Sequence, residues 1–401
     1  MRLVLYTGKG GVGKTTTAAA AAVLAAERGL RTLVASADVA HSLGDVLGER
    51  LGPEPRRLAP GLFGLEIDPR VESARHWGRI QGFLERTFRH QGIEAAVAEE
   101  LAMLPGAEEL TTLLAVEQLA ESRSYDLLVL DCAPTDAALR LVTLPEVASG
   151  MVRLALQLAG AFSGVAVPLA KRVVAMPLPD SEVFAEAEAL LYRNLAALRA
   201  RLSAEETTVR LVVTPERMVI DEARRAHTEL ALFEVACDAV IVNRMLPDGA
   251  LSEPFFRDWG RVQAERLAEI ESGFSPLPVL RAPLQDDEVL GLPRLAAHGR
   301  ALFGDAAPDA VLSRAQPVRF ARERGAYWVR VPVPGVDPAR LDVAVVGGDL
   351  VISTPARRRR LALPRRYAPL QLRAARVHGG TLHVRFERDP ATPRAARAGA
   401  G

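Results

Sequence analysis

The beginning of the chain constrains its fold most, because an apolar stretch there runs directly into a glycine-rich loop. Residues 2–7 read RLVLYT, and residues 8–16 read GKGGVGKTT. The loop has the spacing G-x-x-x-x-G-K-[ST] of a phosphate-binding loop. Its fixed positions are Gly8, Gly13, Lys14 and Thr15. The pattern predicts a strand, a phosphate loop and then a helix over residues 15–28.

The residue types in this loop suit a nucleoside triphosphate and its magnesium ion. Glycines let the backbone turn its N–H groups toward the phosphates without a Cβ in the way. The helix that follows adds the positive end of its dipole, Lys14 reaches the β- and γ-phosphates, and the Thr15 hydroxyl binds Mg²⁺. We therefore expect a nucleotide site made by Gly8, Lys9, Gly10, Gly11, Val12, Gly13, Lys14, Thr15 and Thr16.

Lysine usage supports the same interpretation. The chain has 50 basic residues, but its lysines are only Lys9, Lys14 and Lys171. Two of these three therefore lie in the loop, where a compact ammonium fits between glycines better than a forked guanidinium.

Length and composition indicate an ordinary globular protein with more than one domain. The chain has 401 residues, of which 49% are hydrophobic and 25% charged. Two cysteines, Cys132 and Cys237, are too few for a disulfide framework or a C-x-x-C zinc site. Because the sequence enters a strand at once, it shows no signal peptide, and we expect a cytoplasmic protein.

Charge divides the chain near Ala315. Residues 316–401 contain 17 arginines and 6 acidic residues, a net charge of +11, whereas residues 1–315 carry −10. A basic portion can bind nucleic acid. Here its arginines lack interleaved aromatic residues and no recognition motif accompanies them, so we expect no nucleic-acid partner. Docking on the acidic portion is the alternative.

Two further apolar segments end in an aspartate. Residues 30–38 read LRTLVASAD and residues 125–131 read YDLLVLD, so both are predicted buried parallel strands. An acidic residue at the carboxyl end of such a strand lies where ligands bind in open α/β sheets. Asp131 matches the Walker B position, which orients Mg²⁺ directly or through water. Asp38 is the second candidate, with an N-cap of the next helix as its structural alternative.

Three ordered motifs give the chain a specific resemblance. GKGGVGKTT, DVAHSLGD (residues 38–45) and DCAPTDAALRLVTLP (residues 131–145) are similar to the motifs of one ATPase family. That family includes the arsenite-pump (ArsA-type) ATPase and the guided-entry ATPase for tail-anchored membrane proteins. The resemblance covers about residues 1–304, and implies a doubly wound, mostly parallel α/β sheet with a helical insertion.

The resemblance also implies roles for individual residues. Asp38 would position or activate the attacking water, with His41 and Ser42 in switch I. Switch II would comprise Asp131, Ala133, Pro134 and Thr135. Asn243, in the segment DAVIVNRMLP, would contact the adenine base, and residues 278–295 would close the nucleotide site. Lys9 resembles the signature lysine of deviant Walker A loops, which reaches the nucleotide of the opposite subunit, so a homodimer is expected.

Departures from the family pattern are confined to a few positions. Val39 replaces the usual proline and Asp136 replaces a glycine, and we expect these to change the coupling between switch II and a client. The two cysteines cannot form a metalloid-binding triad. The zinc pair of the targeting ATPases is also missing, so no zinc is expected.

Helical patterns outside the motifs cover about residues 72–122 and 146–205, the predicted client subdomain. Within it, residues 151–170 are the most hydrophobic long stretch. Arg153, Gln157 and Pro168 argue against a membrane span, although the length is barely sufficient. A core helix and a mobile apolar element that holds a hydrophobic client remain as the two interpretations.

The last part of the chain changes to short strands and turns. After a predicted linker over residues 305–317, residues 318–388 alternate in hydrophobicity and contain Gly-Gly turns. They resemble the α-crystallin (small heat-shock protein) sandwich, and residues 389–401 are expected to be disordered.

Together these patterns favour a Mg²⁺-dependent ATPase that acts as a dimer and drives a conformational change. Asp38, Lys9 and Lys14 would be its catalytic residues, and ATP with Mg²⁺ its cofactors. Its partner would be a hydrophobic protein client or a membrane protein. Two alternatives stay open: an arsenite or antimonite efflux-pump ATPase, and a nucleotide-gated chaperone-like protein with little turnover.

Overall fold

The computed structural model describes residues 1–38, 42–68, 71–72, 107–132, 195–323, 325–355 and 358–388. Some predictions fall outside these ranges. They concern most of the helical client subdomain with its apolar stretch 151–170, the tail 389–401, and the switch residues His41, Ala133, Pro134 and Thr135.

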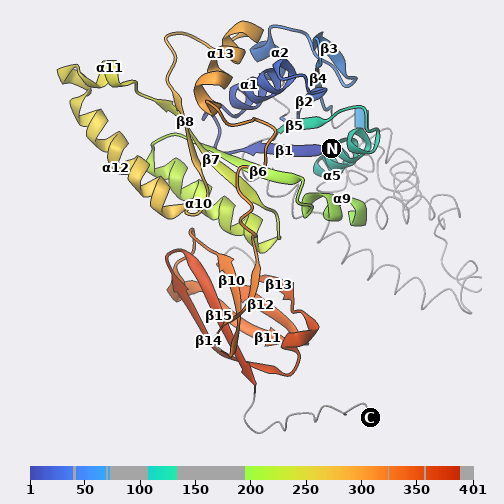
Figure 1. Cartoon of the computed structure of the whole chain (residues 1–401), viewed down its shortest axis with the longest axis vertical. Coiled ribbons are helices and arrows are strands. Elements are labelled where there is room, and N and C mark those ends of the chain that lie inside the picture. The colour runs from blue at the N-terminus through green and yellow to red at the C-terminus, as the bar shows by residue number, and fades with distance from the viewer. Residues whose placement is uncertain are drawn as a thin grey trace, which may run out of the picture.

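A single eight-stranded sheet forms the centre of the first domain, in the order β3-β4-β2-β5-β1-β6-β7-β8 (Figure 1). All neighbouring strands pair parallel except β3 with β4. The strands are β1 (Arg2–Thr7), β2 (Thr32–Ser36), β3 (Arg56–Ala59), β4 (Leu62–Glu66), β5 (Leu127–Asp131), β6 (Thr207–Val213), β7 (Cys237–Met245) and β8 (Val279–Pro283). The predicted doubly wound, mostly parallel fold is therefore confirmed.

The central strands are apolar because helices cover both of their faces. Every residue of β2, β5 and β6 is buried. The strand predicted over residues 30–38 is shorter, since the Leu30 N–H donates to the Ala25 carbonyl in the turn that ends the preceding helix.

Helices lie on the two faces according to the direction of each crossover. The connection from β1 to β2 runs opposite to those from β6 to β7 and from β7 to β8, and right-handed crossovers then place their helices on opposite faces. One face carries α1 (Lys14–Glu27), α2 (Ser42–Leu47) and α13 (Gly291–Phe303) (Figure 1). The other carries α5 (Ala107–Glu121), α9 (Leu195–Leu202), α10 (Arg217–Leu232) and α12 (Arg257–Gly273), with the short α11 (Asp248–Leu251) before α12.

The helix after the phosphate loop packs unusually close to its neighbour. Residues Ala18, Ala20 and Ala22 of α1 are completely buried. Gly299 of α13 lies against them, where an added Cβ would be 2.8 Å from the Ala20 carbonyl oxygen. The alanine-rich sequence thus lets two helices approach to backbone contact.

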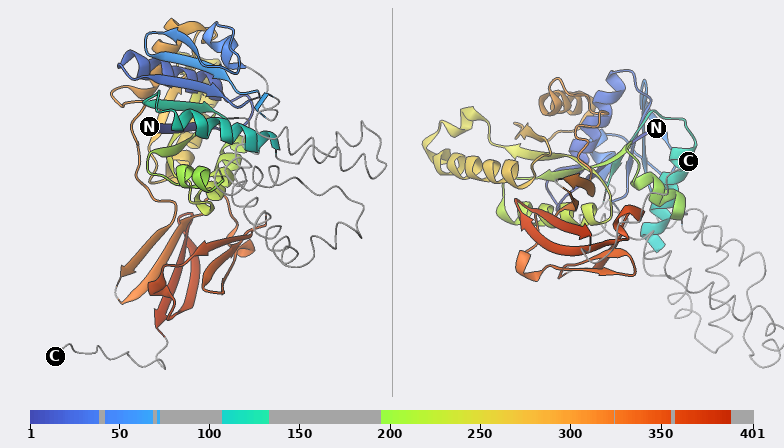
Figure 2. Two further views of the ribbon diagram at one scale, coloured as in Figure 1. Left: turned by 90° about the vertical axis from the view of Figure 1, so that its right-hand side faces the viewer. Right: turned by 60° about the horizontal axis from the view of Figure 1, so that its bottom comes forward.

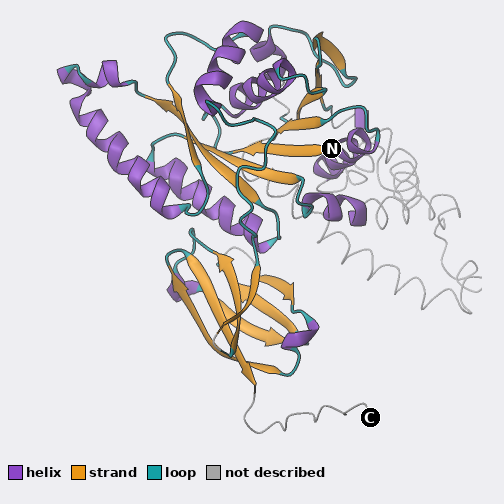
Figure 3. Ribbon diagram, viewed as in Figure 1, coloured by secondary structure: helices purple, strands orange, loops and turns teal. Residues whose placement is uncertain are grey.

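The C-terminal domain is a β-sandwich, as predicted, and Figure 3 shows it to be almost entirely strand. One sheet has the order β14-β15-β10-β9 and the other the order β11-β12-β13. Its strands are β9 (Arg319–Glu323), β10 (Ala326–Pro332), β11 (Asp342–Val346), β12 (Asp349–Ser353), β13 (Arg358–Ala362), β14 (Leu370–His378) and β15 (Thr381–Arg388). Inward-facing side chains such as Val329, Ile352 and Phe386 form its core.

The sandwich docks on the carboxyl-terminal half of α10 (Figures 1 and 2). Ala231 and Leu232 of α10 belong to the same apolar cluster as the sandwich core. The Gly335 N–H donates to the Thr228 hydroxyl at 3.1 Å, and Arg359 Nε donates to the Leu232 carbonyl at 2.8 Å. The basic portion therefore packs against the ATPase portion, which was one of its two interpretations.

A buried cluster of three charged residues lies at the amino-terminal edge of the main sheet. Asp238, at the start of β7, is fully buried. Its carboxylate accepts from Arg2 Nη2 at 2.9 Å and from Arg210 Nε at 3.2 Å. Both arginines and the aspartate also bind the linker backbone, and Arg210 Nη1 donates to Tyr6 Oη at 2.9 Å.

The linker to the sandwich is held by this cluster through its main chain. Arg210 donates to the Pro308 carbonyl at 2.7 Å and to the Ala310 carbonyl at 2.9 Å, while Arg2 Nε donates to the Asp309 carbonyl at 3.0 Å. Buried charges of this kind are stable only while every partner is present. We call Arg2, Arg210 and Asp238 the linker clamp.

Removing the carboxylate of the linker clamp is expected to destabilise the protein strongly. In Asp238→Ala two arginines keep buried positive charge without a counterion, which costs about 3–5 kcal/mol of unfolding free energy. Urea unfolding followed by circular dichroism measures the loss.

The matched control is Asp126→Ala, which breaks an exposed ion pair to Arg31 at the same sheet edge. Exposed pairs contribute little, so its urea midpoint should stay close to that of the wild type. If the urea midpoint fell equally in Asp238→Ala and Asp126→Ala, burial would not be the reason why the linker clamp stabilises the protein.

Candidate nucleotide-binding site

The predicted phosphate loop connects the carboxyl end of β1 to the first turn of α1, as the sequence pattern requires. Gly13 is the N-cap of α1, no side chain caps the helix, and its first turn has no acidic residue. The backbone N–H groups of this turn are therefore left for an anionic ligand, which the helix dipole also favours.

Two glycines of the loop are required by close neighbours. A Cβ on Gly8 would collide with the Val212 carbonyl of β6, and one on Gly13 would collide with the Asn243 side chain. Gly13 also has φ of 88°, in the left-handed region that glycine tolerates best. Any larger residue at either position would push the loop off the sheet.

The two loop lysines have different environments. Lys14 is buried, and its Nζ lies 3.4 Å from the Lys9 carbonyl oxygen within the loop. Lys9 is half-buried, and among the described residues neither lysine forms an ion pair with a carboxylate. A buried ammonium without an ion pair to these residues fits a polyanionic ligand.

Asp131 ends β5 and is completely buried between the carboxyl ends of β1 and β2. Among the described residues, no donor meets either carboxylate oxygen with full hydrogen-bond geometry. Burial raises the pKa of Asp131 to about 7, although the Thr15 and Ser36 hydroxyls and the Lys14 ammonium are near enough to act in the opposite direction. A buried carboxylate without a well-formed hydrogen bond, next to a hydroxyl, is a donor set that fits Mg²⁺.

The described part of switch I lies beside this carboxylate. Thr15 Oγ1 is 3.2 Å from Ser42 Oγ, the first residue of α2. Asp38 directly follows Ala37, whose N–H donates to the Asp131 carbonyl at 2.8 Å, and the charge of Asp38 contributes to the raised pKa of Asp131. Asp38, Ser42, Thr15 and Asp131 thus meet at one edge of the sheet, as the sequence indicated, while His41 and residues 133–135 lie outside the described ranges.

Asn243 lies beneath the phosphate loop, on β7. It is buried, and its Nδ2 donates to the Val12 carbonyl at 2.9 Å. In the structure, this amide therefore holds the loop backbone. Its contact with adenine stays a prediction.

Sequence reasoning missed a residue that supports switch I. Glu66 ends β4, is almost fully buried, and its Oε1 accepts from the Gly44 N–H of α2 at 3.0 Å. The segment LFGLE carries the same signal as the strands before Asp38 and Asp131, an apolar run that ends in a carboxylate. That signal could have located it.

Taken together, the site offers a glycine-lined loop at a helix N-terminus, two ammonium groups, and carboxylate and hydroxyl oxygens for a divalent cation. Such an arrangement stabilises charge on transferring phosphoryl oxygens, which is the main requirement for catalysis of phosphoryl transfer.

Comparison with known proteins agrees with this chemistry. The sequence profile of the anion-transporting ATPase (ArsA) family matches residues 1–304, and a profile for the HSP20-like domain found in ArsA matches residues 324–386.

Similar proteins match nearly the whole chain. "Putative arsenical pump-driving ATPase 1" of Aquifex aeolicus is 34% identical over 94% of this chain and 98% of its own length. "Putative arsenical pump-driving ATPase" of Chlorobaculum tepidum is 35% identical over 96% of both chains. "ATPase GET3" of Podospora anserina is 30% identical over 74% of this chain and 88% of its own length.

The raised pKa of Asp131 gives a testable pH dependence in the protein without nucleotide. Because the folded pKa of about 7 is above the unfolded value of 3.8, the folded state binds this proton more tightly. Its contribution to stability is fully present below pH 3.8 and is lost as the pH rises through 7. Relative to Asp131→Asn, the wild type should therefore lose roughly 4 kcal/mol of unfolding free energy between pH 4 and pH 8.

Urea unfolding of both proteins across this pH range measures the difference. At pH 8, excess magnesium and a non-hydrolysable ATP analogue should raise the unfolding free energy of the wild type but not that of Asp131→Asn. If the difference in unfolding free energy between the two proteins stayed constant over this pH range, the raised pKa of Asp131 would be refuted.

Proposed function

The chain belongs to the anion-transporting (ArsA) ATPase family and is an ATPase of that family, and we propose that it hydrolyses Mg·ATP as a homodimer to drive a conformational change. The finer proposal is that this change controls the binding or targeting of a hydrophobic protein client in the cytoplasm.

The observation that carries the magnesium part is the environment of Asp131. A fully buried, ionised carboxylate that no described donor meets with hydrogen-bond geometry is unfavourable unless it takes up a proton or a cation compensates it. Thr15 and Asp131 would hold Mg²⁺ directly or through water. The ion would supply positive charge next to the transferring phosphoryl group.

The remaining site residues would act on the phosphates and on the attacking water. Gly8 to Gly13 donate backbone N–H groups, and Lys14 neutralises charge on the β- and γ-phosphates. Asp38 follows β2 by two residues, next to the Ala37 N–H that donates to the Asp131 carbonyl, and from there it would align water for attack. Asn243 keeps the loop backbone in its binding conformation through Val12.

Nucleotide binding can move α2 through two contacts. Ser42 meets Thr15, and Glu66 holds the Gly44 N–H. A cation or phosphate that engages the Thr15 hydroxyl competes with Ser42 for it, so the first turn of α2 would respond to the state of the nucleotide. We propose this as the step that carries hydrolysis into the rest of the protein.

A homodimer is supported by Lys9. This lysine is half-buried next to the loop but forms no ion pair with a described residue. In a dimer that places two such loops face to face, its ammonium would reach the nucleotide of the other subunit. Turnover would then require two protomers.

Client binding is supported by relatives and by the docked sandwich. The Podospora anserina relative is named "ATPase GET3", and the HSP20-like domain rests on α10, whose preceding strand β6 contacts the phosphate loop at Gly8. No described helix has the length and apolar character to cross a bilayer.

A role in driving an arsenical pump is the second candidate, because the Aquifex aeolicus and Chlorobaculum tepidum relatives are named for it. Metalloid binding would need accessible thiolates. Cys132 and Cys237 are both buried, and burial raises the pKa of each thiol well above its usual range. Within the described ranges, no group of three or more His, Cys, Asp or Glu side chains could hold a metal ion.

Turnover by variants tests the dimeric ATPase. Wild-type protein should release phosphate from ATP only with magnesium. Asp38→Asn and Lys9→Ala should each lower kcat by about 10²–10³, since each removes a group that acts on the reacting phosphate or water. Light scattering with magnesium and a non-hydrolysable analogue should find a dimer.

Lys171→Ala removes the remaining lysine of the chain and should keep wild-type turnover. Normal turnover in Lys9→Ala would exclude the trans role of this lysine, and a monomer in the presence of nucleotide would exclude the dimer.

Arsenite and antimonite separate the two candidates. Because the thiols are buried and protonated, neither metalloid should change the rate of phosphate release at micromolar to millimolar concentration. A several-fold stimulation that disappears in Cys132→Ala or Cys237→Ala would instead support the pump-driving role.

A further inference from the structure

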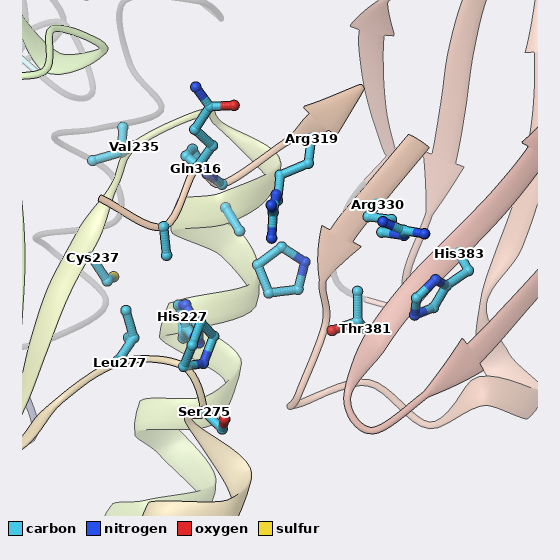
Figure 4. Close-up of a pocket in the computed structure, with 15 residues that line it drawn as sticks. His227, Val235, Cys237, Ser275, Leu277, Gln316, Arg319, Arg330, Thr381 and His383 are labelled. Atoms are coloured by element: carbon cyan, nitrogen blue, oxygen red, sulfur yellow. The ribbon is translucent and has the colours of Figure 1, made fainter. Parts of the chain in front are cut away.

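A cavity of about 290 Å³ lies at the junction between the ATPase domain and the sandwich. Figure 4 shows its lining side chains. One wall comes from α10, the start of β7 and the loop before β8, and the other from β9, β10 and β15. The volume is close to the lower end of the range for small-molecule sites.

Most of the wall on the ATPase side is apolar. Val235, Cys237 and Leu277 line it, and Pro276, Pro317 and Pro332 close the junction. Val235, Cys237 and Leu277 are buried in the protein. This wall suits a hydrocarbon or aromatic group rather than a fully hydrated ion.

The opposite wall is cationic. The register of the sheet places Arg319 opposite Arg330, and Arg330 opposite His383, so three basic side chains form one row across β9, β10 and β15. Arg319 and Arg330 are like charges directly opposite one another, an arrangement that destabilises a sheet. Burial and the charge of Arg330 lower the pKa of His383, so this imidazole adds no third charge at neutral pH. Glu323 forms an ion pair with Arg330, and the 15 lining residues include no carboxylate.

Arg319 is the cation in this row that is available to a ligand. It is exposed, and the described residues provide it with no ion pair or hydrogen bond. In Figure 4 its side chain extends from β9 into the space between the two walls. An anion bound there would offset the repulsion within the row.

His227 gives an independent sign of a missing ligand. It is 8% exposed, and its Nδ1 has no hydrogen-bond partner within the described ranges. The ring packs on Phe274 with centroids 5.8 Å apart, and burial lowers the pKa of His227 to about 4. At neutral pH it is thus an uncharged imidazole with one unsatisfied ring nitrogen on the apolar wall of the cavity.

We propose that this cavity binds a small organic carboxylate with an apolar body. The carboxylate pairs with the Arg319 guanidinium and meets the ring of His227, and the apolar body packs against Val235 and Leu277. The apolar wall and a single available guanidinium favour a monocarboxylate over inorganic phosphate. Because the two walls belong to different domains, the bound ligand ties the sandwich to α10.

Isothermal titration of the full-length protein with phenylacetate and hexanoate tests this proposal. Phenylacetamide, which has the same shape without the charge, and inorganic phosphate are the comparison probes. At least one carboxylate should bind with one-to-one stoichiometry, and phenylacetamide and phosphate should each bind at least tenfold more weakly.

Variants locate the site. Arg319→Gln should weaken carboxylate binding at least tenfold. The control is Arg322→Gln, on the same strand but outside the cavity, where Arg322 lies over the Tyr327 ring; it should bind like the wild type. His227→Phe, which retains the stacking on Phe274, should also weaken binding.

Several outcomes would overturn the proposal. In the titrations, these outcomes are the absence of binding of both carboxylates when each is in tenfold excess over millimolar protein, equal affinity for the acid and the amide, or tighter binding of phosphate. In the variants, the outcome is an equal loss of carboxylate affinity in Arg319→Gln and Arg322→Gln. ATP turnover of Arg319→Gln should match the wild type, so failure here is distinguishable from failure of the ATPase proposal.

Discussion

Parallel pairing of β1 between β5 and β6 is the constraint on which the rest of the molecule depends. It brings all carboxyl ends of the central strands to one edge and all amino ends to the other. At the first edge, the described residues give the Asp131 carboxylate no hydrogen bond of full geometry and the Lys14 ammonium no ion pair. At the second edge, the linker clamp pairs every buried charge. The edge with the carboxyl ends can therefore bind a charged ligand, whereas the charges at the opposite edge already have partners within the protein.

Much of the nucleotide site follows from local sequence. A glycine-rich loop between a strand and a helix predicts its own backbone geometry, and strands that end in Asp38 and Asp131 predict where carboxylates gather. The same reasoning predicted the sandwich, because alternation and Gly-Gly turns are local signals. The family and both fold types were therefore readable without coordinates.

Contacts between distant segments were not readable in this way. Asn243 meets Val12 across 231 positions of sequence, and Arg210 meets the linker about 100 positions later. Neither has a spacing rule, and an arginine inside an apolar strand gives no hint of its partner. Glu66 did carry a local signal, yet its role depends on the position of α2. Side-chain partners that tertiary packing selects lie beyond what periodicity can show.

The linker clamp has one more consequence. Its arginines grip main-chain oxygens of Pro308, Asp309 and Ala310, which any amino acid would supply. Substitutions in this linker are therefore compatible with the same hydrogen bonds. An insertion or deletion of one residue is different, because the carbonyl groups that follow it would move out of register with the two guanidinium groups. The sandwich would then lose its packing position on α10. Among relatives, the linker should vary in amino-acid sequence and stay constant in length.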